Sequence, residues 1–156
     1  MSKSLKRVCA ALEAAGIAPD IREMGQTRTA QEAADAAGCA VDQIVKSIIF
    51  RGQNSGQVLL FLTAGGNRVD ADKASVVAGE ALDKADAALI RTQTGFAIGG
   101  VAPVGHLNPI RSWMDPRLLA FDQVWAAAGT PRHIFQIDPT EIMRLTGAET
   151  AQFTQK

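Results

Sequence analysis

Residue types that can hold a ligand through the main chain gather in one short segment of this sequence. Three glycines, a proline and a histidine occur within the eight residues from Gly99 to His106. Glycine lets a ligand approach the backbone closely, and proline stiffens the chain around it. The segment can therefore present N–H groups in a fixed array beside a side chain that titrates near neutral pH. The alternative interpretation is a tight turn between two strands that is followed by a histidine.

A lysine inside an apolar segment is the second unusual feature. Lys46 lies within residues 44–50, and the alternation of a strand places it on the same face as Ile48 and Phe50. Because burying an unpaired ammonium costs several kcal/mol, Lys46 either extends to water or faces a cleft that holds an anion. If this cleft and the glycine-rich segment met in space, they would form a site for an anion or an ester.

Other chemistry has little support in the composition. The two cysteines, Cys9 and Cys39, and the two histidines, His106 and His133, lack the spacing of a zinc site, so we expect no metal. The cysteines are interpreted as small core residues, and the alternative is a reactive thiol. No apolar run is long enough to cross a membrane, and the N-terminus leads into an amphipathic helix. This pattern predicts a cytoplasmic protein with no membrane association.

Length and charge limit the class of protein. The 156 residues are expected to form one domain, residues 1–156, which buries about two-thirds of its unfolded surface. The 16 basic and 16 acidic residues give a net charge of zero. This balance argues against a domain that binds nucleic acid through many phosphates. A local contact to one end of a nucleic acid is still compatible with a net charge of zero.

Local signals predict the elements that must position these residues. Capping residues predict helices that begin at Ser4, Thr29, about Asp72, Asp86 and Asp138. Apolar runs predict strands near Ile21 and at residues 44–50, 58–62, 118–120, 124–127 and 133–137. Residues 44–50 and 58–62 are predicted to pair as a hairpin buried on both faces, and the last two runs as a second hairpin. Hairpins interspersed with short helices predict an α/β fold with a central mixed, largely antiparallel sheet.

Two segments together, Val45–Phe50 and Thr94–His106, resemble the YbaK and prolyl-tRNA synthetase-associated editing domains. Gly99–Pro103 matches the G-x-x-x-P loop of that family. The resemblance extends from about residue 29 to residue 147 and includes the strand at residues 124–128 with its following turn. It implies a partly curled, barrel-like sheet surrounded by short helices.

The resemblance also implies a role for each matching residue. The lysine that matches Lys46 holds the 3′ end of tRNA near its phosphate and ribose. His106 positions the aminoacyl group, or it closes the turn by a hydrogen bond to the backbone. Ser47 lines the same pocket or is a small core residue, and His133 is interpreted as a packed or edge histidine. The loop orients the ester and the attacking water through the main-chain groups of Gly99, Gly100, Val101, Ala102 and Pro103.

The activity implied by the resemblance is that of a free-standing aminoacyl-tRNA deacylase. It hydrolyses the ester between a wrong amino acid and the terminal adenosine of tRNA, usually tRNA(Pro). Such an ester is already activated, so a positioned water suffices without a strong nucleophile, cofactor or metal.

The expected partners are mischarged tRNA, bound through its 3′ acceptor end, and prolyl-tRNA synthetase. The cysteine-specific branch of the family uses an early tyrosine, and this sequence contains no tyrosine, which favours alanine or another small residue as the amino acid removed. The alternatives are a Cys-tRNA(Pro) deacylase and a non-catalytic module that binds tRNA or a nucleotide.

Overall fold

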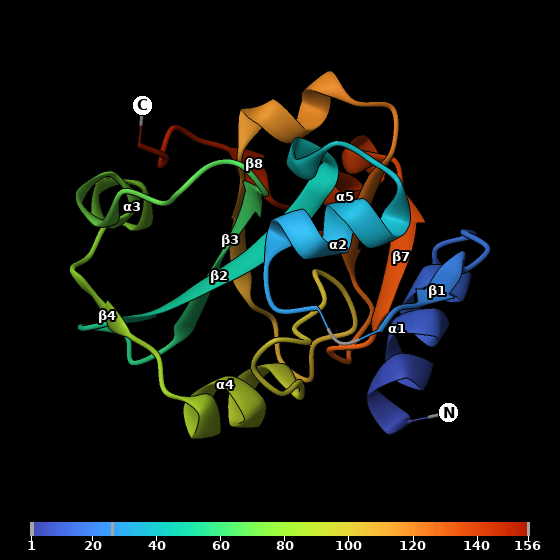
Figure 1. The fold of residues 1–156 in the computed structure, drawn as a ribbon. Helices are drawn as coiled ribbons and strands as arrows, with labels where there is room; N and C mark the ends of the chain where they lie inside the picture. The colour runs from blue at the N-terminus through green and yellow to red at the C-terminus, as the bar shows by residue number, and fades with distance from the viewer. Residues whose placement is uncertain (1, 26, 156) are drawn as a thin grey trace.

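The strands form one mixed sheet in the computed structural model, which describes residues 2–25 and 27–155 (Figure 1). The strands are β1 (Ile21–Glu23), β2 (Ile44–Gly52), β3 (Val58–Ala64), β4 (Leu82–Lys84), β5 (Arg111–Met114), β6 (Val124–Ala127), β7 (His133–Ile137) and β8 (Glu149–Thr150). Their order is β1-β7-β6-β2-β3-β5-β8, and β4 pairs with β2. The hairpins β2–β3 and β6–β7 are antiparallel, whereas β2 pairs with β6 and β3 with β5 in parallel. The predicted mixed α/β fold is confirmed.

Short helices flank the sheet and begin at side-chain caps. The helices are α1 (Lys3–Ala14), α2 (Ala30–Ala37), α3 (Ala71–Ala78), α4 (Ala87–Thr94) and α5 (Pro139–Thr146), with the 3-10 helices η1 (Val41–Gln43) and η2 (Pro116–Ala120). The Thr29 hydroxyl accepts from the N–H of Glu32 at 3.1 Å, and Asp86 accepts from the N–H of Leu89 at 2.7 Å. These bonds satisfy N–H groups that lack a partner within the helix, as the capping residues predict.

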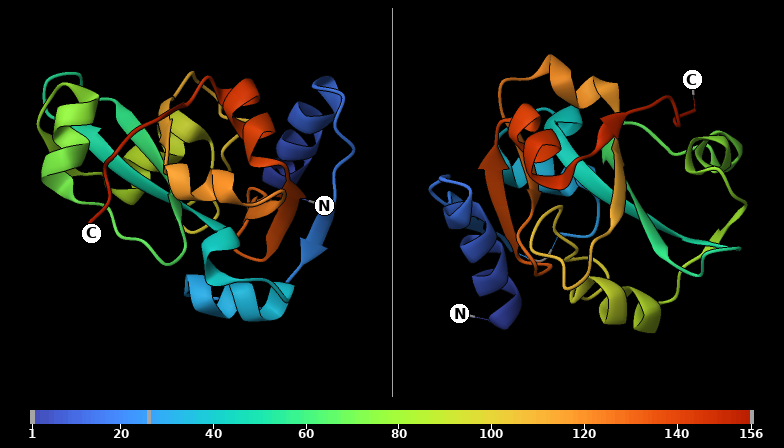
Figure 2. Two further views of the ribbon diagram at one scale, coloured as in Figure 1. Left: turned by 90° about the horizontal axis from the view of Figure 1, so that it is seen from above. Right: turned by 180° about the vertical axis from the view of Figure 1, so that it is seen from behind.

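The helices are distributed over both faces and both ends of the sheet. Figures 1 and 2 show α2 over one face and α5 over the opposite face. They also show α1 beside β7 at one end of the molecule and α3 at the other end. The glycine-rich segment follows α4 directly and leads to β5. It therefore joins a helix to a strand, which differs from the alternative of a tight turn between two strands.

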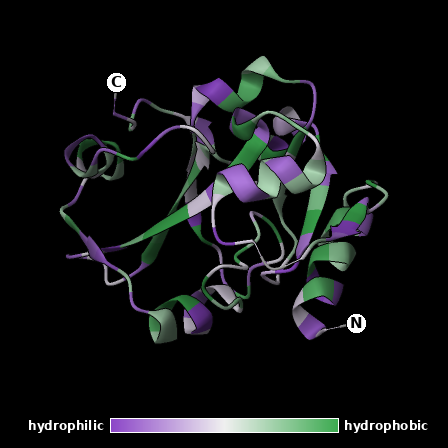
Figure 3. Cartoon of the chain, viewed as in Figure 1, coloured by the Kyte–Doolittle hydropathy of each residue, from purple (hydrophilic) through white to green (hydrophobic). Residues whose placement is uncertain are grey.

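The core is centred on β3, in which every residue is buried. Figure 3 shows the central strands as largely hydrophobic. One cluster of apolar side chains joins β3 to α1, α4 and α5. In a second cluster, the ring of Phe61 stacks on Trp113 at 5.0 Å and meets Phe153 edge-on at 5.1 Å. Both sides of β3 are thus covered, as expected for a strand that is apolar along its whole length.

Three local predictions differ from the structure. Residues 118–120 lie in η2 and not in a strand, because Asp115 accepts a hydrogen bond from the N–H of Arg117 and Pro116 favours a helical start. The first helix begins at Lys3 rather than after Ser4, since the Ser2 hydroxyl accepts from the N–H of Leu5 at 3.1 Å. Residues 46–51 of β2 are half-buried rather than buried on both faces.

A membrane-spanning helix would need a long apolar stretch. Across residues 2–25 and 27–155, none of the helices has the length and apolar character to cross a membrane.

Candidate active site

One cavity brings together residues that lie far apart in the sequence. It has a volume of about 480 Å³, and its walls come from β2, the start of α2, the loop after α4 and the turn between β6 and β7. Of the predicted site residues, Lys46, Ser47, Gly99 and Val101 line this cavity. The lysine on β2 and the glycine-rich segment therefore do meet in space.

Lys46 ends at the cavity wall rather than in open solvent. It lies opposite Thr63 of β3, and its half-buried Nζ donates a hydrogen bond to the main-chain carbonyl of Asn67. Burial lowers the pKa of the Lys46 ammonium, and the positive charge of Arg68 lowers it further. The carboxylates of Asp115 and Asp42 oppose this shift.

A buried carboxylate fixes the loop that holds Lys46. Asp115 is 3% exposed. Its Oδ2 accepts from the side-chain amide of Asn67 at 2.8 Å and from the N–H of Ala64 at 3.1 Å. Its Oδ1 accepts from the N–H of Arg117 at 3.0 Å. Because the carboxylate is buried and satisfied, it holds the Asn67 carbonyl at a fixed distance from β2.

The glycine-rich segment is attached to β2 by Ser47. The Ser47 hydroxyl donates to the Val101 carbonyl at 2.8 Å. Val101 and Ala102 are 3% and 0% exposed, and no hydrogen bond within residues 2–25 and 27–155 engages the N–H group of either residue. Of the two, Val101 lines the cavity, so its N–H group is a donor from which a ligand oxygen could accept, whereas Ala102 lines neither this cavity nor the one beside His106.

Close backbone packing fixes the same segment against the turn between β6 and β7. A Cβ atom on Gly100 would lie 2.8 Å from the Cα and the carbonyl carbon of Thr130. Only glycine leaves room for two backbones at this separation. The segment and the turn therefore form one continuous wall of the cavity.

His106 is the last residue of the glycine-rich segment and bonds back to it. Its Nε2 is 2.6 Å from the Ala102 carbonyl, and its ring meets Phe96 edge-on at 5.9 Å. Burial lowers the pKa of His106, and the nearby charge of Arg7 adds to that effect, although the hydrogen bond to Ala102 opposes it. The neutral ring with hydrogen on Nε2 satisfies this geometry, because a carbonyl can only accept.

The structure does not bring His106 together with Lys46. His106, together with Pro103, lines a separate cavity of about 460 Å³ that Lys46 does not line. Of the two alternatives that the sequence left open for this histidine, closure of the turn by a hydrogen bond to the backbone is the geometry that the structure contains.

His133 lines the cavity although the sequence did not predict it as a site residue. His133, at the start of β7, lines the cavity, and its Nδ1 is 2.6 Å from the Thr130 hydroxyl. Its Nε2 faces the Glu23 carboxylate at 3.7 Å. The available signal was the Gly-Thr-Pro turn at residues 129–131, which ends two positions before His133 and forms part of the family resemblance.

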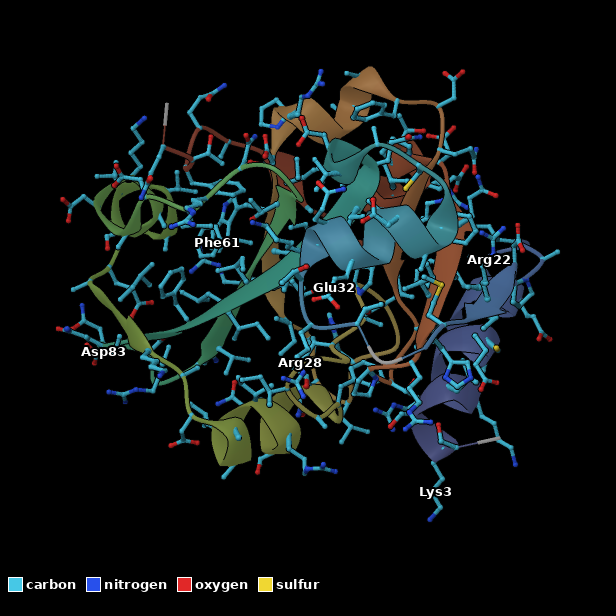
Figure 4. All side chains as sticks on the ribbon, viewed as in Figure 1. Lys3, Arg22, Arg28, Glu32, Phe61 and Asp83 are labelled. Atoms are coloured by element: carbon cyan, nitrogen blue, oxygen red, sulfur yellow. The ribbon has the colours of Figure 1, made fainter. Side chains whose placement is uncertain are left out.

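Positive side chains surround the mouth of the cavity. Arg28, labelled in Figure 4, and Lys84 line it together with Lys46. Both Arg28 and Lys84 are exposed. Apolar side chains such as Ile48 and Trp125 provide much of the remaining wall. This combination of cations, apolar surface and main-chain donors suits an anionic ligand that also has an apolar part.

The side chains offer no activated thiolate. Burial raises the pKa of Cys9 and of Cys39, which disfavours the nucleophilic thiolate form, and neither cysteine lines the cavity. In the described part of the chain, no group of three or more His, Cys, Asp and Glu side chains is arranged to hold a metal ion.

Comparisons with known proteins point to one family. A model of the aminoacyl-tRNA editing domain matches residues 25–145. The chain is 31% identical over 114 residues to the uncharacterized protein YwhH of Bacillus subtilis (strain 168), covering 73% of this chain and 72% of that protein.

Solved structures resemble the whole chain. A crystal structure described as a candidate trans-editing enzyme for prolyl-tRNA synthetase is 46% identical, with a TM-score of 0.92 over 100% of this chain and 99% of the other. The crystal structure of the hypothetical protein APE2540 is 29% identical, with a TM-score of 0.86 over 96% of this chain and 99% of the other.

Proposed function

The chain belongs to the aminoacyl-tRNA editing domain family, and from this premise we propose that it acts as a deacylase of mischarged tRNA. In this proposal residues 1–156 act as a single domain, in trans, on tRNA(Pro) that carries alanine or another small noncognate amino acid. The single observation that carries the proposal is the cavity in which Lys46 meets the G-x-x-x-P loop, Gly99–Pro103. The neighbour described as a trans-editing enzyme for prolyl-tRNA synthetase supports tRNA(Pro) as substrate and that synthetase as partner.

The proposed binding mode follows from the charges of the cavity. Lys46, Arg28 and Lys84 attract the phosphate and ribose at the 3′ end of tRNA, and Lys46 contacts the ligand. Ser47 holds the Val101 carbonyl, which keeps the segment in place while its N–H groups face the reaction. The substrate is in the cytoplasm, so the proposed activity belongs there.

The proposed reaction is hydrolysis of an activated ester. A water oxygen forms a bond to the carbonyl carbon of the aminoacyl group, and the bond between that carbon and the ribose 3′ oxygen breaks. The N–H group of Val101, which lines the cavity, stabilises the oxyanion that develops in between. The proton of the water passes to the leaving 3′ oxygen through the neighbouring 2′-hydroxyl of the substrate. His106 holds the segment through Ala102 rather than by contact with the aminoacyl group.

The function is tested by deacylation of tRNA(Pro) charged with alanine, cysteine, serine or threonine. We expect release of alanine, and a loss of about 10- to 100-fold in kcat/KM for Lys46→Ala, because a hydrogen bond to a charged group contributes about 1.5–3 kcal/mol. Lys3→Ala is the matched control, since Lys3 points away from the body of the molecule (Figure 4). Equal rates for Lys46→Ala and wild type would show that the role of Lys46 is wrong.

Two further outcomes separate the alternatives. Cysteine released faster than alanine would identify a Cys-tRNA(Pro) deacylase. Binding of tRNA without hydrolysis of any aminoacyl ester would identify a binding module.

The role of the substrate 2′-hydroxyl is tested with a tRNA that ends in 2′-deoxyadenosine, which should abolish turnover. Unchanged turnover with that substrate would rule out the proton path through the 2′-hydroxyl.

A further inference from the structure

We propose that Arg7, on the N-terminal helix α1, is a positioning residue that holds both ends of the segment 95–106 in the geometry needed at the candidate site. The catalytic part of this inference rests on the proposed deacylase function. The helix lies outside residues 25–145, the part of the chain that matches the editing-domain model.

The guanidinium of Arg7 bridges the two ends of the segment. Its Nη2 donates to the Gly95 carbonyl at 2.6 Å, and its Nε donates to the Gly105 carbonyl at 2.9 Å. The two carbonyls are ten positions apart in the sequence and belong to glycines with φ of +82° and +81°. A planar, forked cation can satisfy two acceptors in a fixed relative orientation, which an ammonium on a flexible chain cannot do as well.

The same guanidinium also contacts an aromatic ring within the segment. It lies 4.6 Å from the centre of the Phe96 ring, and Phe96 is fully buried. The Phe96 ring in turn meets His106, which bonds the Ala102 carbonyl. Arg7 is thus linked through packed side chains to Ala102, the neighbour of the cavity-lining Val101.

The backbone of α1 closely approaches the glycine-rich segment and the turn between β6 and β7. A Cβ on Gly105 would lie 3.2 Å from the Arg7 carbonyl oxygen, and a Cβ on Gly129 would lie 2.8 Å from the Ser4 carbonyl oxygen. Gly105 belongs to the glycine-rich segment, and Gly129 belongs to the turn that precedes His133. Helix α1 therefore contacts the two site loops at once and sets the distance between them.

Arg7 must act by fixing the position of the segment, and not by placing a charge near the reacting atoms. Arg7 lines neither the cavity that contains Lys46 nor the cavity that contains His106. Its loss should allow the segment to shift without removing any group that touches substrate. A shift of about 1 Å can lower a rate by about 100-fold, so we expect an effect on kcat with little effect on KM.

The test compares Arg7→Ala and Arg7→Lys with Lys6→Ala, which removes one exposed positive charge from the same helix. Deacylation of Ala-tRNA(Pro) gives kcat and KM, and amide hydrogen exchange reports on residues 96–106. For Arg7→Ala we expect kcat to fall by about 10- to 100-fold with KM within about threefold, and ethylguanidinium to restore part of kcat. Exchange of the segment should be about tenfold faster while the central strands keep their protection. Arg7→Lys should lie between wild type and Arg7→Ala.

The exchange measurement separates this inference from the proposed function. If the wild type hydrolyses none of the aminoacyl esters, the proposed function fails, and faster exchange in Arg7→Ala still supports the positioning role. Unchanged exchange of residues 96–106 in both Arg7 variants would overturn the inference, whether or not the protein is active. A fall in kcat equal to that of Lys6→Ala would overturn its catalytic part.

Discussion

The substitution Gly100→Ala adds one methyl group where the glycine-rich segment meets the turn between β6 and β7. The new Cβ would lie 2.8 Å from the Cα and the carbonyl carbon of Thr130 and 3.0 Å from its nitrogen. Ordinary contact begins at 3.4 Å. All three atoms belong to the backbone, so no side-chain rotation can relieve the overlap. The segment or the turn must therefore move by at least about 0.6 Å, the difference between 3.4 and 2.8 Å.

The magnitude of the effect follows from this displacement. A misplacement of about 1 Å at a reacting centre costs about 100-fold in rate, so we expect kcat of Gly100→Ala to fall by about 10- to 100-fold. Overpacking by one methyl group costs about 1–3 kcal/mol of stability. The φ of Gly100 lies outside the left-handed region, so alanine adds no backbone strain at this position.

A stability-matched control separates displacement from general destabilisation. Gly79, at the end of α3, has φ of +78° and no heavy atom within 4 Å of a built Cβ. Gly79→Ala should cost about 1–2 kcal/mol through backbone strain and leave kcat unchanged. Single-turnover deacylation of Ala-tRNA(Pro) and thermal unfolding would be measured for both variants. If Gly100→Ala keeps the wild-type rate, or if both variants lose rate in proportion to stability, displacement of the segment is not the cause of a rate loss.

Three further predictions concern the residues that hold the site. Asp115→Ala leaves three amide donors, on Ala64, Asn67 and Arg117, without their acceptor and should cost about 1–3 kcal/mol in urea unfolding. Exposed Asp122→Ala should stay within about 0.5 kcal/mol, and equal losses would contradict this. Because burial lowers the pKa of His106 in the folded protein, its stabilising effect is present above its ordinary pKa of 6.5 and is lost as the pH falls below that value. The stability difference between wild type and His106→Gln should therefore shrink from pH 7.5 to about pH 5.5, and a constant difference would contradict the assignment. Ser47→Ala removes the bond to the Val101 carbonyl and should lower kcat by about tenfold with little change in KM, whereas a change in KM alone would indicate direct substrate contact.

The elements that could be predicted are those fixed by neighbouring residues. The Thr29 and Asp86 caps, and the glycines that end their helices, act within four residues of the backbone groups that they satisfy. The hairpin of β2 and β3 is similarly local, because a short turn joins two long apolar runs. Such features depend little on the rest of the fold.

The elements that were missed depend on distant partners. β5 pairs in parallel with β3, and the strand at Arg111–Met114 shows no alternation that would distinguish it from loop. The apolar run at residues 118–120 has strand-like composition, but the cap at Asp115 and the proline after it favour a helical turn. Tertiary pairing and capping override composition at both places.

The candidate site was predictable in its parts but not in its layout. The resemblance identified Lys46 and the loop, and the fold brings them to one cavity. The orientation of His106 depends on its packing against Phe96, and no local sequence pattern indicates this packing. His133 lies on β7, and the Gly-Thr-Pro turn before it was its only signal in the sequence. Arg7 contacts the segment from α1, and no sequence pattern connects it to the glycines.

The most direct test of the account is single-turnover release of alanine from Ala-tRNA(Pro) by wild type and Lys46→Ala, with both proteins folded. We expect release by the wild type well above the uncatalysed rate, and a fall of about 10- to 100-fold for the variant. Release no faster than uncatalysed hydrolysis for alanine, cysteine, serine and threonine esters alike would contradict it.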